Sequence, residues 1–72
     1  MAITNEQLEH WFLYHAPQPG QPEAYAHLRQ AALEFARVVV KLTPESADQT
    51  AAIRKLRECV FTANAAIACD GK

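Results

Sequence analysis

Hydrophobic residues recur every three or four positions over two long stretches of the chain. In residues 22–42 the recurring set is Tyr25, Leu28, Ala32, Phe35, Val39 and Leu42. In residues 47–69 it is Ile53, Leu56, Val60, Ala63 and Ile67. This spacing places an apolar seam along one face of each of two α-helices. Residues 43–46, which include Pro44, stop the first of them and turn the chain, so the pattern predicts an antiparallel helical hairpin.

A shorter helix is predicted ahead of the hairpin, from residue 5 to residue 12. Thr4 and Gln7 have the spacing of a capping box, in which each side chain bonds the backbone N–H of the other residue. A loop follows, because Pro17, Pro19 and Gly20 do not allow the helix to continue.

The two hairpin helices carry boundary signals of their own. Pro22 suits the first position of a helix, where its missing N–H would have no partner in any case. Ser46 and Gln49 predict a second capping box at the start of the last helix. No stretch alternates with the period of a strand. We therefore expect one all-α domain over residues 1–72, with helices at about 5–12, 22–42 and 47–69.

The small size of the chain predicts self-association. A chain of 72 residues buries only roughly 60% of its unfolded surface, and such chains usually need disulfides, metals or partner copies. Cys59 and Cys69 are too far apart for a disulfide, with ~15 Å of helix axis between them. His10, His15 and His27 show no familiar metal spacing with either cysteine, so we expect no metal and no cofactor. A homo-oligomer is the remaining solution.

The apolar surface of the hairpin is also wider than one seam, since Val38, Val40 and Phe61 lie outside it. We expect the short helix, through Trp11 and Phe12, to cover part of this surface. Copies of the same chain are expected to cover the rest.

Charge and hydropathy exclude several classes of partner. The formal net charge is -1, which argues against DNA binding. No apolar run approaches the ~18 residues of a membrane span, and the first residues lack the features of a secretory signal. An intracellular protein with no membrane partner is the expectation.

Four residues are candidates for binding. Arg29 is suited to gripping phosphate in a bidentate way, or it pairs with a glutamate of the short helix. Tyr14 and His15 lie on a proline-bounded loop, where a tyrosine ring either stacks on a nucleobase or packs on the hairpin. Asn64 lies among small apolar residues and either fixes the helix register or reads a ligand edge. No nucleophile–base pair, carboxylate pair, P-loop or zinc motif is present, so we expect no enzyme activity.

A resemblance is carried by four segments of the chain, in this order: Phe12-x-Tyr14-His15-Ala16-Pro17; Gln21, Tyr25 and Leu28-Arg29; Pro44-x-Ser46; and Ala63-Asn64-Ala65-Ala66-Ile67-Ala68. They resemble the helical-hairpin domain of small phage proteins. That family includes anti-CBASS sponges for cyclic nucleotides and is associated with proteins that counter Thoeris signalling.

The resemblance implies a function. The characterised sponges are helical oligomers, typically hexamers, that bind cyclic dinucleotides without degrading them and so deprive a host defence effector of its messenger. A tyrosine ahead of the first long helix stacks on a base there, and a basic residue of a neighbouring subunit contacts phosphate. Tyr14 and Arg29 match these roles, and the implied location is the cytoplasm of the infected bacterial host. The alternative is a helical oligomeric protein-interaction module with no nucleotide ligand.

Overall fold

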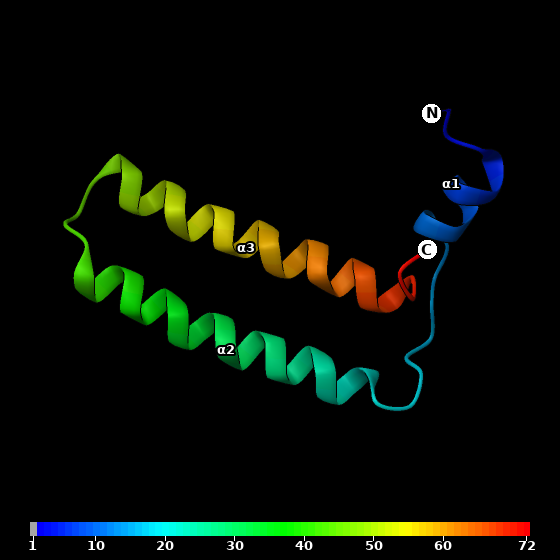
Figure 1. The fold of residues 1–72 in the computed structure, drawn as a ribbon, viewed down its shortest axis with the longest axis horizontal. Helices are drawn as coiled ribbons and strands as arrows, with labels where there is room; N and C mark the ends of the chain where they lie inside the picture. Colours follow the sequence, from blue (N-terminus) through cyan, green and yellow to red (C-terminus); the bar gives the residue numbers. More distant parts are fainter. Residues whose placement is uncertain (1) are drawn as a thin grey trace.

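A computed structural model describes residues 2–72 of the chain. Within them lie three helices, α1 (Asn5–Phe12), α2 (Gln21–Leu42) and α3 (Ala47–Ala68), and no strand. Helices α2 and α3 run antiparallel side by side, and α1 lies beyond the open end of the hairpin, near the C-terminus (Figure 1). The principal extents of 45, 31 and 16 Å describe a flat, elongated molecule. The predicted all-α fold and its helical hairpin are confirmed.

The start of α1 follows the prediction. The Thr4 hydroxyl accepts from the Gln7 backbone N–H at 3.1 Å, and the Gln7 side chain accepts from the Thr4 N–H at 3.0 Å. The capping box is therefore complete.

The start of α2 lies one residue earlier than predicted, so Pro22 is its second residue and not its first. Gly20, at φ 85°, caps the helix in the left-handed region that suits glycine. The Gln21 side chain accepts from the Gln18 N–H at 2.8 Å, and this turn brings Gln21 into the first helical turn.

The predicted second capping box is only half formed. Ser46 accepts from the Gln49 N–H at 3.1 Å, as expected. The Gln49 amide instead donates across the hairpin turn to the carbonyl oxygens of Val40 and Thr43, because those last carbonyls of α2 have no partner within their own helix. The helix α3 ends at Ala68, so Cys69 is its C-cap and not its last residue.

The seam between α2 and α3 differs from the prediction at two positions. All five predicted residues of α3 are half-buried, as are four of those on α2. Phe35 and Leu42 are exposed, and Ala36 is half-buried in place of Phe35. The physical reason is that a straight helix has 3.6 residues per turn and drifts away from a strict heptad spacing.

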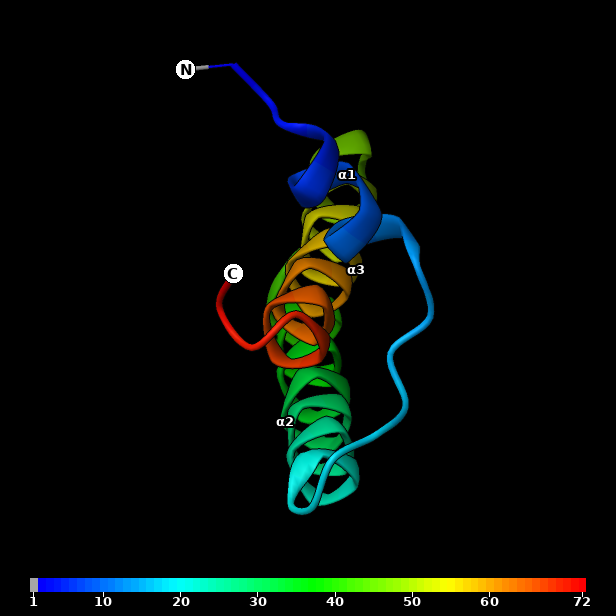
Figure 2. The same cartoon turned by 90° about the vertical axis from the view of Figure 1, so that its right-hand side faces the viewer.

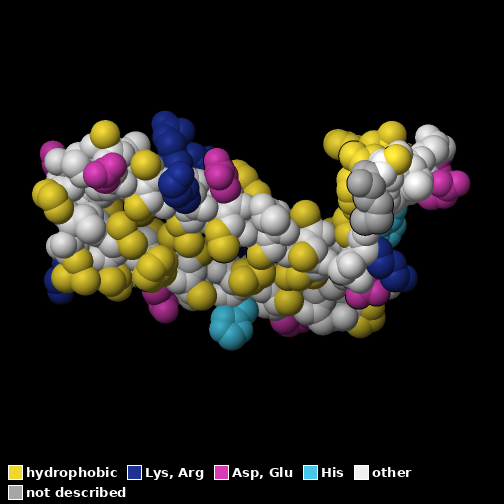
Figure 3. Space-filling view, turned by 45° about the horizontal axis from the view of Figure 1, so that its top comes forward, with side chains coloured by type: hydrophobic (Ala, Val, Ile, Leu, Met, Phe, Trp, Pro, Cys, Tyr) yellow, Lys and Arg dark blue, Asp and Glu magenta, His cyan; other side chains and the backbone are white. Residues whose placement is uncertain are grey.

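No side chain within residues 2–72 is fully buried. Figure 3 shows hydrophobic side chains gathered along one face of the hairpin and on the N-terminal segment. The expected cover by α1 is partial for Trp11, which is 43% exposed and lines a hollow together with Ala65 and Ala66 of α3. It is wrong for Phe12, which is 81% exposed because α1 extends past the hairpin instead of lying along it. None of the described helices is long and apolar enough to cross a membrane.

Candidate functional site

A large hollow of the surface lies where the loop after α1 meets the C-terminal turn. It has a volume of about 680 Å³, and residues from both ends of the chain line it. Those used below are His10, Tyr14, His15, Cys69, Asp70 and Lys72. We call it the loop groove.

Tyr14 stands at the loop groove with its ring free. Tyr14 is 86% exposed, so its ring does not pack on the hairpin, which was one of its two predicted roles. The ring is open to solvent, as the other predicted role, stacking on a base, requires. The backbone that carries it is held on both sides. His15 bonds the carbonyl oxygen of His10, and the Gln21 amide donates to the Ile67 carbonyl of α3 at 2.9 Å. Figure 2 shows the loop running from the end of α1 to the start of α2. A ring that is exposed on an anchored backbone is suited to stacking against a flat ligand.

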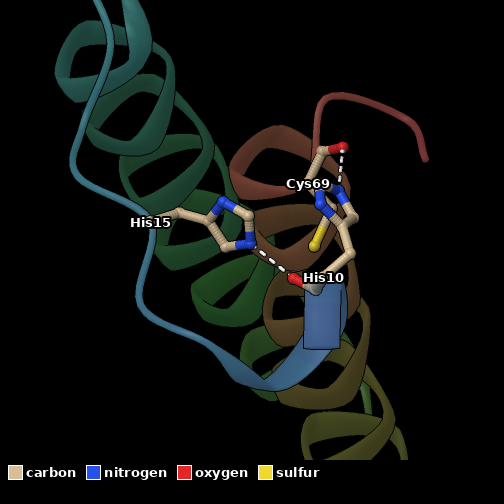
Figure 4. A group of neighbouring side chains, drawn as sticks. All are labelled: His10, His15 and Cys69. Atoms are coloured by element: carbon tan, nitrogen blue, oxygen red, sulfur yellow. Dashed lines mark hydrogen bonds between the residues drawn. The ribbon is translucent and has the colours of Figure 1, made fainter. Parts of the chain in front are cut away.

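The structure brings His15 together with two residues that were not predicted to form a site. One ring nitrogen each from His10 and His15 and the Cys69 sulfur lie within 4.8 Å of one another (Figure 4). The sequence held a partial signal, because the four residues between His10 and His15 fit a spacing seen in zinc sites. Cys69 could not be assigned from sequence, since only the fold places the C-terminus beside α1. Both cysteines are free.

Arg29 lies elsewhere, and the structure does not bring it to Tyr14 within one chain. It lines a second hollow of about 240 Å³ on the hairpin, together with Leu56, Arg57 and Phe61 of α3. The Arg57 guanidinium lies over the Phe61 ring, 5.8 Å from its centroid. Exposed Arg29 and Arg57 therefore place two cations beside an otherwise apolar surface.

Asn64 is half-buried on α3, and its side-chain oxygen is buried with no hydrogen-bond partner. A buried amide oxygen without a donor is costly, because it has lost water and gained nothing. Asn64 was predicted either to fix the register between helices or to recognise the edge of a ligand. Either role would supply a hydrogen-bond donor to this oxygen, and both roles stay predictions.

Comparison with known proteins identifies one family. Its model, described as the Acb2/Tad1 hairpin domain, matches residues 4–68, which is most of the chain. The matched segment contains α1, the loop and the whole hairpin. No curated protein and no solved structure matches the chain.

Proposed function

Because the chain belongs to the Acb2/Tad1 hairpin domain family, we propose that it is a phage protein that sequesters a cyclic dinucleotide messenger of host anti-phage defence. Binding occurs without degradation, and the complex forms in the cytoplasm of the infected bacterium. The single observation that carries this proposal is the exposed ring of Tyr14 on its anchored loop beside the loop groove.

Tyr14 supplies the contact to a base. Its ring is already exposed and its backbone already held, so binding costs little ordering of the protein. Each stacked base is worth roughly 1–3 kcal/mol. His15 lies beside it in the same groove, which the opposite charges of Asp70 and Lys72 also line.

A neighbouring subunit supplies the phosphate contact. Arg29 is exposed on the hairpin and away from the loop groove of its own chain, so it meets a ligand on Tyr14 only across an interface. A cyclic dinucleotide has two bases and two phosphates related by near two-fold symmetry. A two-fold interface offers two Tyr14 and two Arg29 side chains with the same symmetry, so the small chain encloses a ligand that it could not surround alone.

The exposed surface supports such an assembly. The chain has 6052 Å² of accessible surface, whereas a compact monomer of 8.0 kDa has about 4,450 Å² by the usual scaling. The excess of roughly 1,600 Å² is what one chain buries in about two interfaces of standard size. A chain with two different interfaces can build a closed ring or a larger symmetric assembly, and we propose a hexamer.

The test is retention of an intact nucleotide. The purified protein is incubated with a panel of cyclic dinucleotides and with ADP-ribose-derived signals, separated from free ligand, and heated to release what it holds. We expect one compound to be recovered unchanged in mass and amount from the wild type. Y14A should retain much less, and Y14F, which keeps the ring, should retain nearly as much. Failure of every compound to be retained would refute the proposal.

The alternative is a helical oligomeric interaction module with no nucleotide ligand. The observation that favours it is the exposed apolar set on the hairpin, which includes Leu33, Phe35, Val40 and Phe61. Under this alternative Y14A and R29A leave the activity in infected cells unchanged, while F35D abolishes it. The two functions are thus separated by the same variants.

A further inference from the structure

Three side chains that commonly bind transition metals lie together where α1 meets the C-terminal turn. His10 belongs to α1, His15 to the loop after it, and Cys69 caps α3. One nitrogen from each imidazole and the Cys69 sulfur lie within 4.8 Å of one another. All three side chains line the loop groove and are half-buried.

Backbone carbonyl groups hold both rings. His10 Nε2 lies 3.0 Å from the Cys69 carbonyl oxygen, and His15 Nε2 bonds the His10 carbonyl oxygen. Because a carbonyl oxygen only accepts, each Nε2 carries a proton and each neutral ring keeps its lone pair on Nδ1. Carbonyl groups orient the histidines of metal sites in the same way, and this arrangement leaves Nδ1 of His10 as its ligand atom. His15 instead turns its Nε2 edge toward the other two residues (Figure 4), so metal binding at that atom gives up the bond to the His10 carbonyl and moves the ring proton to Nδ1.

The distances are close to those of a bound metal. For tetrahedral zinc, with Zn–N of about 2.0–2.1 Å and Zn–S of about 2.3 Å, neighbouring ligand atoms lie about 3.3–3.6 Å apart. The three atoms need to close by roughly 1 Å, which small side-chain rotations provide. The rings meet edge to face, with centroids 4.7 Å apart and planes at 75°, so neither is stacked flat upon the other.

We propose that His10, His15 and Cys69 bind a zinc ion, which clamps α1 to the end of the hairpin. Two imidazoles and a thiolate favour Zn²⁺ over Mg²⁺ and Ca²⁺, which prefer oxygen ligands. Water from the loop groove completes the tetrahedron. The charges of Asp70 and Lys72, which line the same groove, are opposite and offset one another. The clamp would add to the hydrogen bond between His10 and the Cys69 carbonyl oxygen, which joins α1 to the end of α3.

The experiment is a metal titration of the full chain under reducing conditions. Zn²⁺ is followed by calorimetry, and Co²⁺ by the thiolate-to-cobalt charge-transfer absorption that reports a bound cysteine sulfur. We expect one metal ion per chain, a charge-transfer band, and a thermal midpoint that rises with Zn²⁺ concentration. H15Q and C69S should each weaken zinc binding at least tenfold and remove the rise in the midpoint.

Two matched variants control for the residue types. C59S removes the other cysteine, which is exposed on α3, and H27Q removes an exposed histidine of α2. Both should bind zinc as the wild type does. Far-UV circular dichroism checks that H15Q and C69S remain helical, as expected for changes at the end of the hairpin. Wild-type binding no tighter than that of C69S, or loss of the cobalt band in C59S instead of C69S, would overturn the proposal.

Discussion

Replacing Phe35 by aspartate tests whether partner copies cover the hairpin. Phe35 is 58% exposed on α2 although its size and hydrophobicity suit an interior. An aromatic side chain buries 150–250 Å² when covered, so an interface over Phe35 would remove about 100 Å² or more from water. At about 25 cal/mol per Å², that area is worth close to 3 kcal/mol for each copy.

The change should therefore weaken the assembly strongly. A loss of about 3 kcal/mol raises a dissociation constant roughly 100-fold, and burying the new carboxylate adds to the effect. Mass is measured by light scattering after size exclusion and by sedimentation over a dilution series. We expect a wild-type oligomer and an F35D chain that dissociates at concentrations where the wild type stays assembled.

The control is Q30D, which adds the same charge on a different side of α2, at an exposed glutamine whose amide donates to Glu34 in the next turn. It should keep the wild-type mass. Circular dichroism checks that F35D remains helical. The reasoning is refuted if F35D keeps the wild-type mass at every dilution, or if the wild type is itself a well-folded monomer.

Further predictions concern single residues. Y14A should raise the dissociation constant of the retained nucleotide about 5- to 150-fold, at 1–3 kcal/mol per base, while the thermal midpoint stays unchanged because the ring is 86% exposed. Q49A should lower the free energy of unfolding in urea by about 1 kcal/mol, since the carbonyls of Val40 and Thr43 lose their donor. G20A should cost roughly 1–2 kcal/mol by the same measure. Its cause is the backbone alone, because φ is +85° and nothing lies within 4 Å of an added Cβ. N64A should raise the thermal midpoint, because it removes a buried oxygen without a donor; a lower midpoint would show that the assembly supplies one.

Much of the fold could be predicted because it depends on local signals. The helix spacing of the apolar residues and the Thr4 cap act within a few residues of the chain, and all three helices begin and end within one residue of the prediction. The predictions that were wrong concern side chains whose surroundings depend on the neighbouring helix and not on adjacent residues of the chain. Gln49 bonds the end of α2 instead of its own cap, and Phe35 leaves the seam because helix drift brings Ala36 there.

The candidate site was predictable only in part. Tyr14 could be singled out from the sequence because it is an aromatic residue that lies outside both predicted apolar seams. In the structure its ring is exposed. Its surroundings could not be predicted, because the far end of the chain supplies Cys69, Asp70 and Lys72 to the same groove. Sequence spacing cannot show this meeting, which depends on the matched lengths of α2 and α3 returning the C-terminus to α1.

The separation of Tyr14 from Arg29 links the fold to the proposed function. One copy places the Tyr14 ring and the Arg29 guanidinium at two separate hollows, so it cannot hold one ligand between them. The same geometry leaves Phe35 and Phe61 more than half exposed. One event, the packing of copies against each other, would bury those rings and bring a partner's cation to the loop groove. Stability and ligand binding would then depend on the same interface, so F35D should weaken nucleotide retention even though Phe35 lines neither hollow that contains Tyr14 or Arg29.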